Sequence, residues 1–461
     1  MPLNQKSQSK EVYHVLDNAK SSGRHYGVTL LSVAGTFLDG YDISIIGVAL
    51  TIITAISAFS YASTPLGKGL MAASTTIGML VGALSIGYVT DLKGRKFMYL
   101  WDMVIFIIFT ALITVSFNYW SLFIFRLILG IAIGADYAIG ATIISEFSPK
   151  KSRGKYLASD GLAWWVGAAT AFIVGYLLLG TGINSWRYMF AIGIIPAVIV
   201  LILRTKVPES ARWLANKGDI KGAQATERFM TGKADKTLKV TRQKVSFMTL
   251  FDKKWIKNTI YFGLAWFFYD VAFYGIGLFT PTILILLGLT HQMSILGSAV
   301  FSSIAIIGAV MCILTVDRWG RKPITILGFA GMFVSLLVLA IIAMKIPSDA
   351  FAAGITGVVI ASMYVLFELT QSWGMGSTDF VYGQELFPLS IRATGQGWGV
   401  TISRIGAILG LTTFPVIVSI YGLGYGLLFF AIAGLLGMLL TIFMAPETKG
   451  KTLEELEAKA E

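Results

Sequence analysis

The stretch LAWFFYDVAFYGIG, residues 264–277, is apolar and aromatic from end to end except for one carboxylate, Asp270. Continuous apolar character of this kind is typical of a segment that crosses a lipid bilayer. An ionised aspartate near the middle of such a segment costs about 3 kcal/mol or more. The stretch therefore predicts a membrane-spanning helix whose single acid is kept for a function.

The rest of the chain extends this pattern. Of its 461 residues, 55% are hydrophobic and 13% are charged, whereas a soluble domain typically has about 25% charged residues. Apolar runs of about 20 residues, long enough to span the hydrocarbon core, recur from near residue 27 to near residue 446, and we count twelve of them. The sequence predicts an all-α membrane protein with twelve transmembrane helices.

The formal net charge of +12 is concentrated in alternate loops. Residues 92–96, 148–155, 204–257 and 317–322 are basic, whereas residues 116–120 and 419–426 carry no charge. This alternation follows the positive-inside rule, so we expect a plasma-membrane protein with both termini in the cytoplasm. The polar first 25 residues lack the apolar core of a signal peptide. The charge therefore reflects topology and does not indicate a nucleic-acid partner.

Reactive and metal-binding residues are scarce. The single cysteine, Cys312, excludes an internal disulfide, and His14, His25 and His291 fall outside or at the edges of the expected spans. We find no nucleotide loop, metal cluster or nucleophile motif in a suitable context. We expect no enzyme activity, cofactor or metal, and a monomer whose partners are a small solute, protons and the bilayer.

The sequence contains an internal duplication. Glu146 and Glu385 occupy equivalent places 239 residues apart, and so do Arg153 and Arg392. We expect two six-helix halves, with a solute site at their interface near the midplane. The predicted division is a tail (1–26), a first half (27–205), a linker with short amphipathic helices (206–256), a second half (257–446) and a C-terminal tail (447–461).

Several motifs identify a family resemblance. GYVTDLKGRK (87–96) resembles the loop between helices two and three of the major facilitator superfamily, and DRWGRK (317–322) is its second copy. VPESARWL (207–214) and PETKGKTLEELE (446–457) are similar to sugar porters. The resemblance implies the two-half fold and a network of charges that latches helix ends. The expected ion-pair or gating residues are Asp91, Arg95, Glu146, Arg153, Asp317, Arg321, Glu385 and Arg392.

Ionisable residues inside the first half are candidates for proton coupling, because each must be paired, protonated or hydrated. Asp39 and Asp42 are three residues apart in span one and share a helix face. Arg126 in span four is expected at a depth where it could bridge to Asp42. Asp136, deeper in the same span, has no obvious local cation. We expect Asp39, Asp42 and Asp136 to carry protons together with Asp270.

The second half supplies candidate substrate contacts. Asp270 aligns with Asp42 of the first half, and Trp266 and Tyr274 lie four residues before and after it on one helix face. Arg404 in span eleven needs a carboxylate or an anionic ligand, so it either contacts the substrate or forms a static bridge to Asp270 or Asp39. Weaker candidates are Gln371 for substrate contact and Glu368 for an ion pair, and Asp379, Asp102 and Asp160 near helix ends carry little weight.

A narrower resemblance concerns the substrate. FLDGYD (37–42), the segment 134–154 and WFFYDVAFYG (266–275) resemble phosphate:proton symporters, whereas the segment 392–410 resembles aromatic acid:proton symporters. The resemblance implies that Tyr137, Trp266, Asp270 and Tyr274 are site residues, with Arg404 where the phosphate family has lysine. The chain departs from that family at Gly376 and Trp164, where asparagine and glutamine are expected, and it lacks the glutamine pair of sugar porters in span seven.

These residues suggest a mechanism. Four aspartates against Arg126 and Arg404 give a net charge of −2 near the expected cavity, which repels an anion until carboxylates are protonated. We expect a proton symporter that imports a small anion, such as phosphate or an organic carboxylate, by alternating access. The substrate would bind among Tyr137, Trp266, Asp270, Tyr274, Arg404 and Gln371. The alternatives are a sugar or polyol symporter, a cation or drug antiporter and a sensor that binds without transporting.

Overall fold

The computed structural model describes residues 14–149, 153–235, 247–346, 354–387 and 391–449, and these form helices joined by short connections. Twelve helices are long and apolar enough to cross a membrane. The described residues contain no β-strand. The predicted all-α membrane architecture is confirmed.

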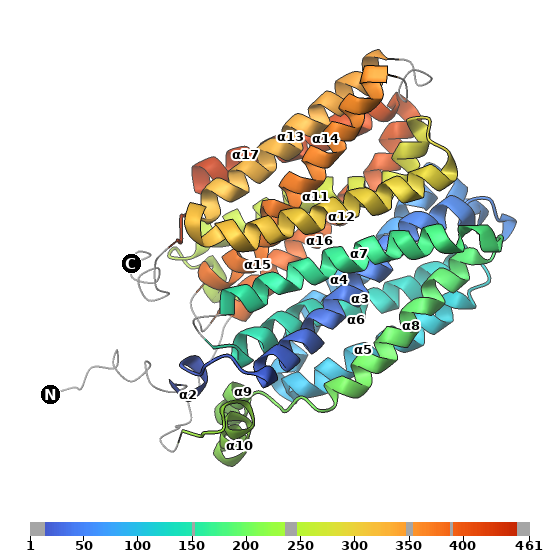
Figure 1. Ribbon diagram of the computed structural model, residues 1–461. Coiled ribbons are helices and arrows are strands. Elements are labelled where there is room, and N and C mark those ends of the chain that lie inside the picture. Colours follow the sequence, from blue (N-terminus) through green and yellow to red (C-terminus); the bar gives the residue numbers. More distant parts are fainter. Residues whose placement is uncertain (1–13, 150–152, 236–246, 347–353, 388–390, 450–461) are drawn as a thin grey trace.

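The first six spans form one half of the molecule, shown in blue to green in Figure 1. They are preceded by the short helix α2 (His14–Asp17). The spans are α3 (Gly23–Ile53), α4 (Pro65–Lys93), α5 (Arg95–Thr114), α6 (Tyr119–Phe147), α7 (Arg153–Leu178) and α8 (Ser185–Arg204). Short 3₁₀ segments, η1 (Ser57–Ser63) and η2 (Leu179–Thr181), complete the connections.

The second half, yellow to red in Figure 1, lies beside the first and begins after η3 (Phe247–Phe251). Its tenth span is broken, because Gly374 has φ −77° and ψ −122°, outside the helical region. The break separates α14 from α15 within one membrane crossing. The helices are α11 (Ile256–Leu286), α12 (His291–Trp319), α13 (Arg321–Lys345), α14 (Gly354–Trp373), α15 (Met375–Glu385), α16 (Arg392–Tyr421) and α17 (Leu423–Met444).

Two short helices, α9 (Ala211–Lys217) and α10 (Ile220–Thr231), occupy the predicted linker and lie at one end of the bundle, here called the linker end. The buried apolar cluster that holds them joins linker residues to residues of α2 and the first half, among them Leu16 and Tyr99, and includes no described residue of the second half. The Arg24 guanidinium donates to the Phe229 carbonyl and lies 5.1 Å from its ring centre. The linker helices are therefore packed onto the first half.

Repeated helix caps explain why the sequence duplicates its charged motifs. Before α5, Gly94 has φ 103°, and the Glu209 carboxylate accepts from the next two backbone amides at 3.0 and 3.1 Å. Before α13, Gly320 has φ 97°, and Glu447 accepts from the next two amides at 3.1 and 3.0 Å. A positive φ favours glycine, and a carboxylate stabilises a helix N-terminus. Each half thus carries the same cap.

The two halves meet along α3 and α11, α4 and α16, and α7 and α12. Small residues bring the backbones close, since a Cβ on Gly47 would collide with the Leu278 carbonyl. At the end opposite the linker, the far end, His291 Nε2 and Thr51 Oγ1 form a hydrogen bond of 2.7 Å between the halves. The halves are in contact at the far end.

We predict that Gly40→Ala destabilises the protein. A Cβ at Gly40 would lie 3.0 Å from the Trp164 carbonyl carbon and closer still to its oxygen, so α3 and α7 would have to move apart. Overpacking of this kind costs about 1–3 kcal/mol. The midpoint of thermal unfolding in detergent should fall. The control is Gly27→Ala on the same helix, where nothing lies within 4 Å. Equal midpoints for the two variants would contradict the prediction.

Candidate functional site

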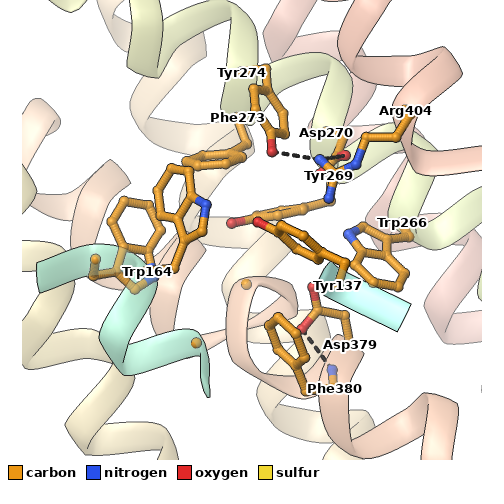
Figure 2. Close-up of a pocket in the computed structure, with 13 residues that line it drawn as sticks. Tyr137, Trp164, Trp266, Tyr269, Asp270, Phe273, Tyr274, Asp379, Phe380 and Arg404 are labelled. Carbon is orange, nitrogen blue, oxygen red and sulfur yellow. Dashed lines mark hydrogen bonds and ion pairs between the residues drawn. The ribbon is translucent and has the colours of Figure 1, made fainter. Parts of the chain in front are cut away.

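A cavity lies between the halves, enclosed by α6 and α7 from the first and α11, α15 and α16 from the second (Figure 2). Its free volume is about 30 Å³, room for no more than a few water molecules. Its charged residues are Asp270, Asp379 and Arg404. Most of its wall is aromatic, from Tyr137, Trp164, Trp165, Trp266, Tyr269, Phe273, Tyr274 and Phe380. A solute would need the halves to separate.

Arg404 is the cation of this cavity. Its Nη1 lies 3.2 Å from Asp270 Oδ2 and donates to the Tyr274 hydroxyl at 2.5 Å. The guanidinium carbon is 4.9 Å from the Tyr137 ring centre. Its Nε is buried and has no hydrogen-bond partner among the described residues. Because Nη1 carries both of these bonds, the Nε donor remains for an anion.

Local sequence explains why Arg404 reaches Asp270. A Cβ on Gly406 would collide with the Phe267 carbonyl, and one on Gly410 would collide with the Val271 carbonyl. These glycines let α16 pack directly on the backbone of α11. The structure therefore brings Tyr137, Trp266, Asp270, Tyr274 and Arg404 to one cavity, and their role in substrate binding stays a prediction.

Asp379 also lines the cavity, although sequence reasoning gave it little weight as a residue near a helix end. It is 3% exposed, and its Oδ1 accepts from the Phe380 amide at 2.7 Å. It has no ion-pair partner among the described residues. The helix break at Gly374 places α15 against the cavity, and the GMG triplet at 374–376 was the signal that could have indicated this.

Asp42 lies outside the cavity, paired with Arg126. Arg126 Nη1 is 3.4 Å from Asp42 Oδ2, and its Nε donates to Ser74 Oγ at 3.2 Å. The Arg126 side chain is fully buried, and its guanidinium carbon lies 5.3 Å from the Phe190 ring centre. This is the bridge that the two depths in the sequence suggested.

The prediction that Asp136 lacks a local cation is wrong. Arg204 Nη2 donates to both oxygens of Asp136 at 3.0 and 3.2 Å, and its Nη1 lies 3.3 Å from Asp102. The Arg204 guanidinium carbon is 3.7 Å from the Tyr99 ring centre. Sequence reasoning missed Arg204 because a basic residue at the end of a span indicates topology. Asp102, expected at the membrane interface, is 3% exposed and belongs to this group.

Asp39 and Asp160 extend the group. Asp39 is 2% exposed, its Oδ2 has no hydrogen-bond partner among the described residues, and the charges of Asp136, Arg204, Asp102 and Asp160 all act on it. Asp160, also expected near a helix end, is buried and accepts from Thr36 at 2.6 Å. We call these four carboxylates and Arg204 the Arg204 cluster. With one cation for four acids, the cluster can hold protons.

The weaker candidates of span ten lie behind the cavity wall. Glu368 was expected in an ion pair, but it forms none with the described residues and accepts from Gln371 Nε2 at 2.9 Å. Gln371 Oε1 accepts from the Tyr269 hydroxyl at 2.7 Å. Gln371 was expected to bind substrate, but it is absent from the cavity wall and touches it only through Tyr269.

The charged motifs at the linker end pair within each half. Arg95 lies 3.7 Å from Glu146, and both belong to the first half. Arg321 lies 2.8 Å from Glu385 and 2.9 Å from Asp317, all in the second half. The described pairs therefore hold each half together. The side chains of the other expected members, Asp91, Arg153 and Arg392, lie outside the described residues.

Comparisons with known proteins agree with this geometry. The family model described as "Sugar (and other) transporter" matches residues 28–460. The putative metabolite transport protein YaaU of Escherichia coli K12 is 34% identical over 95% of this chain and 96% of its own. The glucose transporter GlcP of Staphylococcus epidermidis is 30% identical over 94% and 96%. The proton:xylose symporter XylE superposes with a TM-score of 0.78 at 24% identity, over 95% of this chain and 99% of XylE.

We predict that Arg204→Met destabilises the protein by about 3–5 kcal/mol, because removal of one partner leaves buried charges unpaired. Adding Asp136→Asn should restore part of the loss, since the amide carries no charge. Thermal unfolding in detergent measures both effects. The control is Arg228→Met on the exposed face of α10. A wild-type midpoint for Arg204→Met would show that the cluster does not depend on its cation.

Proposed function

The chain belongs to the sugar and other transporter family of the major facilitator superfamily, and from this premise we propose that it is a proton-coupled symporter for a small organic carboxylate. It is an integral membrane transporter and not an enzyme. The finer proposal concerns the substrate, the coupling ion and the direction. We place the linker end in the cytoplasm of a plasma-membrane protein that works as a monomer, since the basic loops lie at that end.

One observation supports the substrate proposal: Arg404 lines an aromatic cavity and keeps one donor unpaired. Its Nη1 bonds to Asp270 and Tyr274, while Nε has no partner among the described residues. A carboxylate can accept from the free edge of a guanidinium, and the aromatic walls can pack against the organic part of the substrate. Inorganic phosphate, the other anion considered, has no apolar part to use these walls.

The second candidate is a sugar or polyol. It is favoured by the names of two related proteins, a glucose transporter and a proton:xylose symporter. A polyol needs many neutral donors and acceptors, and the cavity wall contains no asparagine or glutamine. The cation antiporter is favoured only by the excess of carboxylates. The carboxylate proposal accounts for Arg404, which neither alternative requires.

Proton coupling is supported by three acidic sites. Asp270 holds Arg404 in the cavity, Asp42 pairs with Arg126, and the Arg204 cluster has more acids than cations. Protonation of Asp270 would release Arg404 from its internal partner, so the anion would bind better. By linkage, anion binding would then favour protonation by the same factor. We propose that Asp39, Asp42 and Asp136 exchange the protons that reach Asp270.

The proposed transport step follows from the small volume of the cavity. Its small volume requires movement of the halves before a solute can enter, and the His291 to Thr51 hydrogen bond must break for the far end to open. Because the buried ion pairs lie within single halves, the halves can rock without losing them. This is the alternating access expected from two parallel repeats.

We predict that Arg404→Ala lowers uptake of an organic acid by about tenfold or more, since a charged hydrogen bond contributes about 1.5–3 kcal/mol. The measurement is uptake of radiolabelled benzoate and nicotinate into proteoliposomes under an inward proton gradient, with phosphate and glucose as comparison solutes. Arg228→Ala is the control. Wild-type accumulation of glucose alone would support the sugar alternative and contradict the proposal.

We predict that Asp270→Asn abolishes accumulation driven by the proton gradient but preserves exchange of the same acid between the two sides. The amide cannot release a proton, so it uncouples movement from the gradient. Counterflow without a gradient measures exchange, and Asp252→Asn on an exposed position outside the membrane is the control. Gradient-driven accumulation at the wild-type level in Asp270→Asn would refute the coupling role.

A further inference from the structure

The cavity holds one acid more than its charge balance requires. Arg404 pairs with Asp270, and Asp379 lines the same cavity without an ion-pair partner among the described residues. A simple anion bound at Arg404 would therefore share the cavity with an uncompensated carboxylate. Like charges enclosed together in a medium of low dielectric repel strongly. The proposed substrate leaves Asp379 unexplained.

The position of Asp379 makes it part of the binding surface. The helix break at Gly374 starts α15 at Met375, and this turns Asp379 toward the cavity. Its Oδ1 is held by the Phe380 amide at 2.7 Å, which fixes the carboxylate. No hydrogen bond from a described residue engages Oδ2. A carboxylate that is fixed, buried and lacks a second partner is suited to accept from a ligand.

Arg404 and Asp379 lie at separate places on the wall. In Figure 2, Arg404 lies beside Asp270 and Tyr274, Asp379 lies on the opposite side of the cavity, and the rings of Tyr137 and Trp266 stand between them. The Phe380 ring, next to Asp379, is 6.2 Å from the Trp266 ring. The cavity is therefore bipolar, with an anion site at one end, an acceptor at the other and aromatic walls in the middle.

We propose that Asp379 is a specificity residue, which selects substrates that carry a hydrogen-bond donor or a positive centre on the side opposite the carboxylate held by Arg404. The substrate class is an amphoteric, ring-sized organic acid. This rests on the proposed function, because Arg404 is taken as the site of the carboxylate. It goes further than the proposed function because it assigns the opposite end of the substrate, with its donor or positive centre, to Asp379.

The expected selectivity arises because ligand binding removes water from the Asp379 carboxylate, and only some ligands supply a donor that replaces this water. An acid with an apolar far end would cover the Asp379 carboxylate without replacing its water, and a diacid would place a second negative charge against it. A donor at that end would pair with it. Sites built around a hydrogen bond reject analogues that lack it far more strongly than apolar pockets reject a missing methylene.

The test uses binding to the purified full chain in detergent, which is independent of transport. The probes are benzoate, para-aminobenzoate, para-hydroxymethylbenzoate and terephthalate, read by quenching of tryptophan fluorescence, since Trp164, Trp165 and Trp266 line the cavity. We expect the two acids with a donor to bind at least roughly tenfold more tightly than benzoate, and terephthalate to bind least. In Asp379→Asn the differences should shrink to within roughly threefold.

Asp252→Asn is the control, and the unfolding midpoint of each variant checks that it is folded. If Asp379→Asn unfolds early, Asp379→Ser replaces it, with the same expected loss of discrimination. Equal binding of benzoate and para-aminobenzoate to the wild-type protein overturns the role of Asp379 while the proposed function stands. The role of Asp379 is also overturned if Asp379→Asn binds benzoate more tightly than the wild type but keeps the wild-type ratio of para-aminobenzoate to benzoate affinity. That result would make Asp379 a proton carrier. Failure of every acid to bind overturns the proposed function as well.

Discussion

The cost of burying charge inside a membrane is the constraint on which this structure depends. Among the described residues, the three arginines with almost fully buried side chains each have a carboxylate partner: Asp42 for Arg126, Asp136 for Arg204 and Asp270 for Arg404. Breaking such a pair leaves an isolated charge, which is far more costly than the pair itself. In each of these three pairs both partners belong to one half, so no buried arginine depends on the other half for its counter-charge. The carboxylates in excess of the arginines remain to be neutralised by protons or ligands.

The sequence was sufficient for the architecture and for much of the cavity. Apolar run lengths predicted the twelve spans, and the duplicated motifs predicted the two halves. The spacing of Trp266, Asp270 and Tyr274 placed them on one face of one helix, which needs no knowledge of neighbouring helices. Arg404 and Tyr137 were added by their chemistry and by the family resemblance. Helical periodicity is local information, and the placement of Trp266, Asp270 and Tyr274 depended mainly on it.

The remaining residues depended on how helices cross, which a single sequence does not contain. Arg204 closes the last turn of α8, yet glycine at position 35 leaves room for its guanidinium beside Asp136, where a Cβ would collide with both. Asp379 was given little weight because it lies near the end of span ten, and the break at Gly374 was not predicted. For both Arg204 and Asp379 the sequence gives the residue type but does not show which side chains of neighbouring helices surround it. Partners from separate helices were predicted where similar depths suggested them, as for Asp42 and Arg126, or where a buried guanidinium needed a carboxylate, as for Arg404 and Asp270.

The attachment of α9 and α10 to the first half has a consequence for how the linker end moves when the halves change their relative angle. The buried cluster that holds them includes no residue of the second half. When the halves rock, these helices travel with the first half, whereas η3 packs against Trp398 of α16 and travels with the second half. Any change in the angle between the halves must therefore alter the separation between α10 and η3 at the linker end, whatever charge or cargo lies in the middle of the bundle.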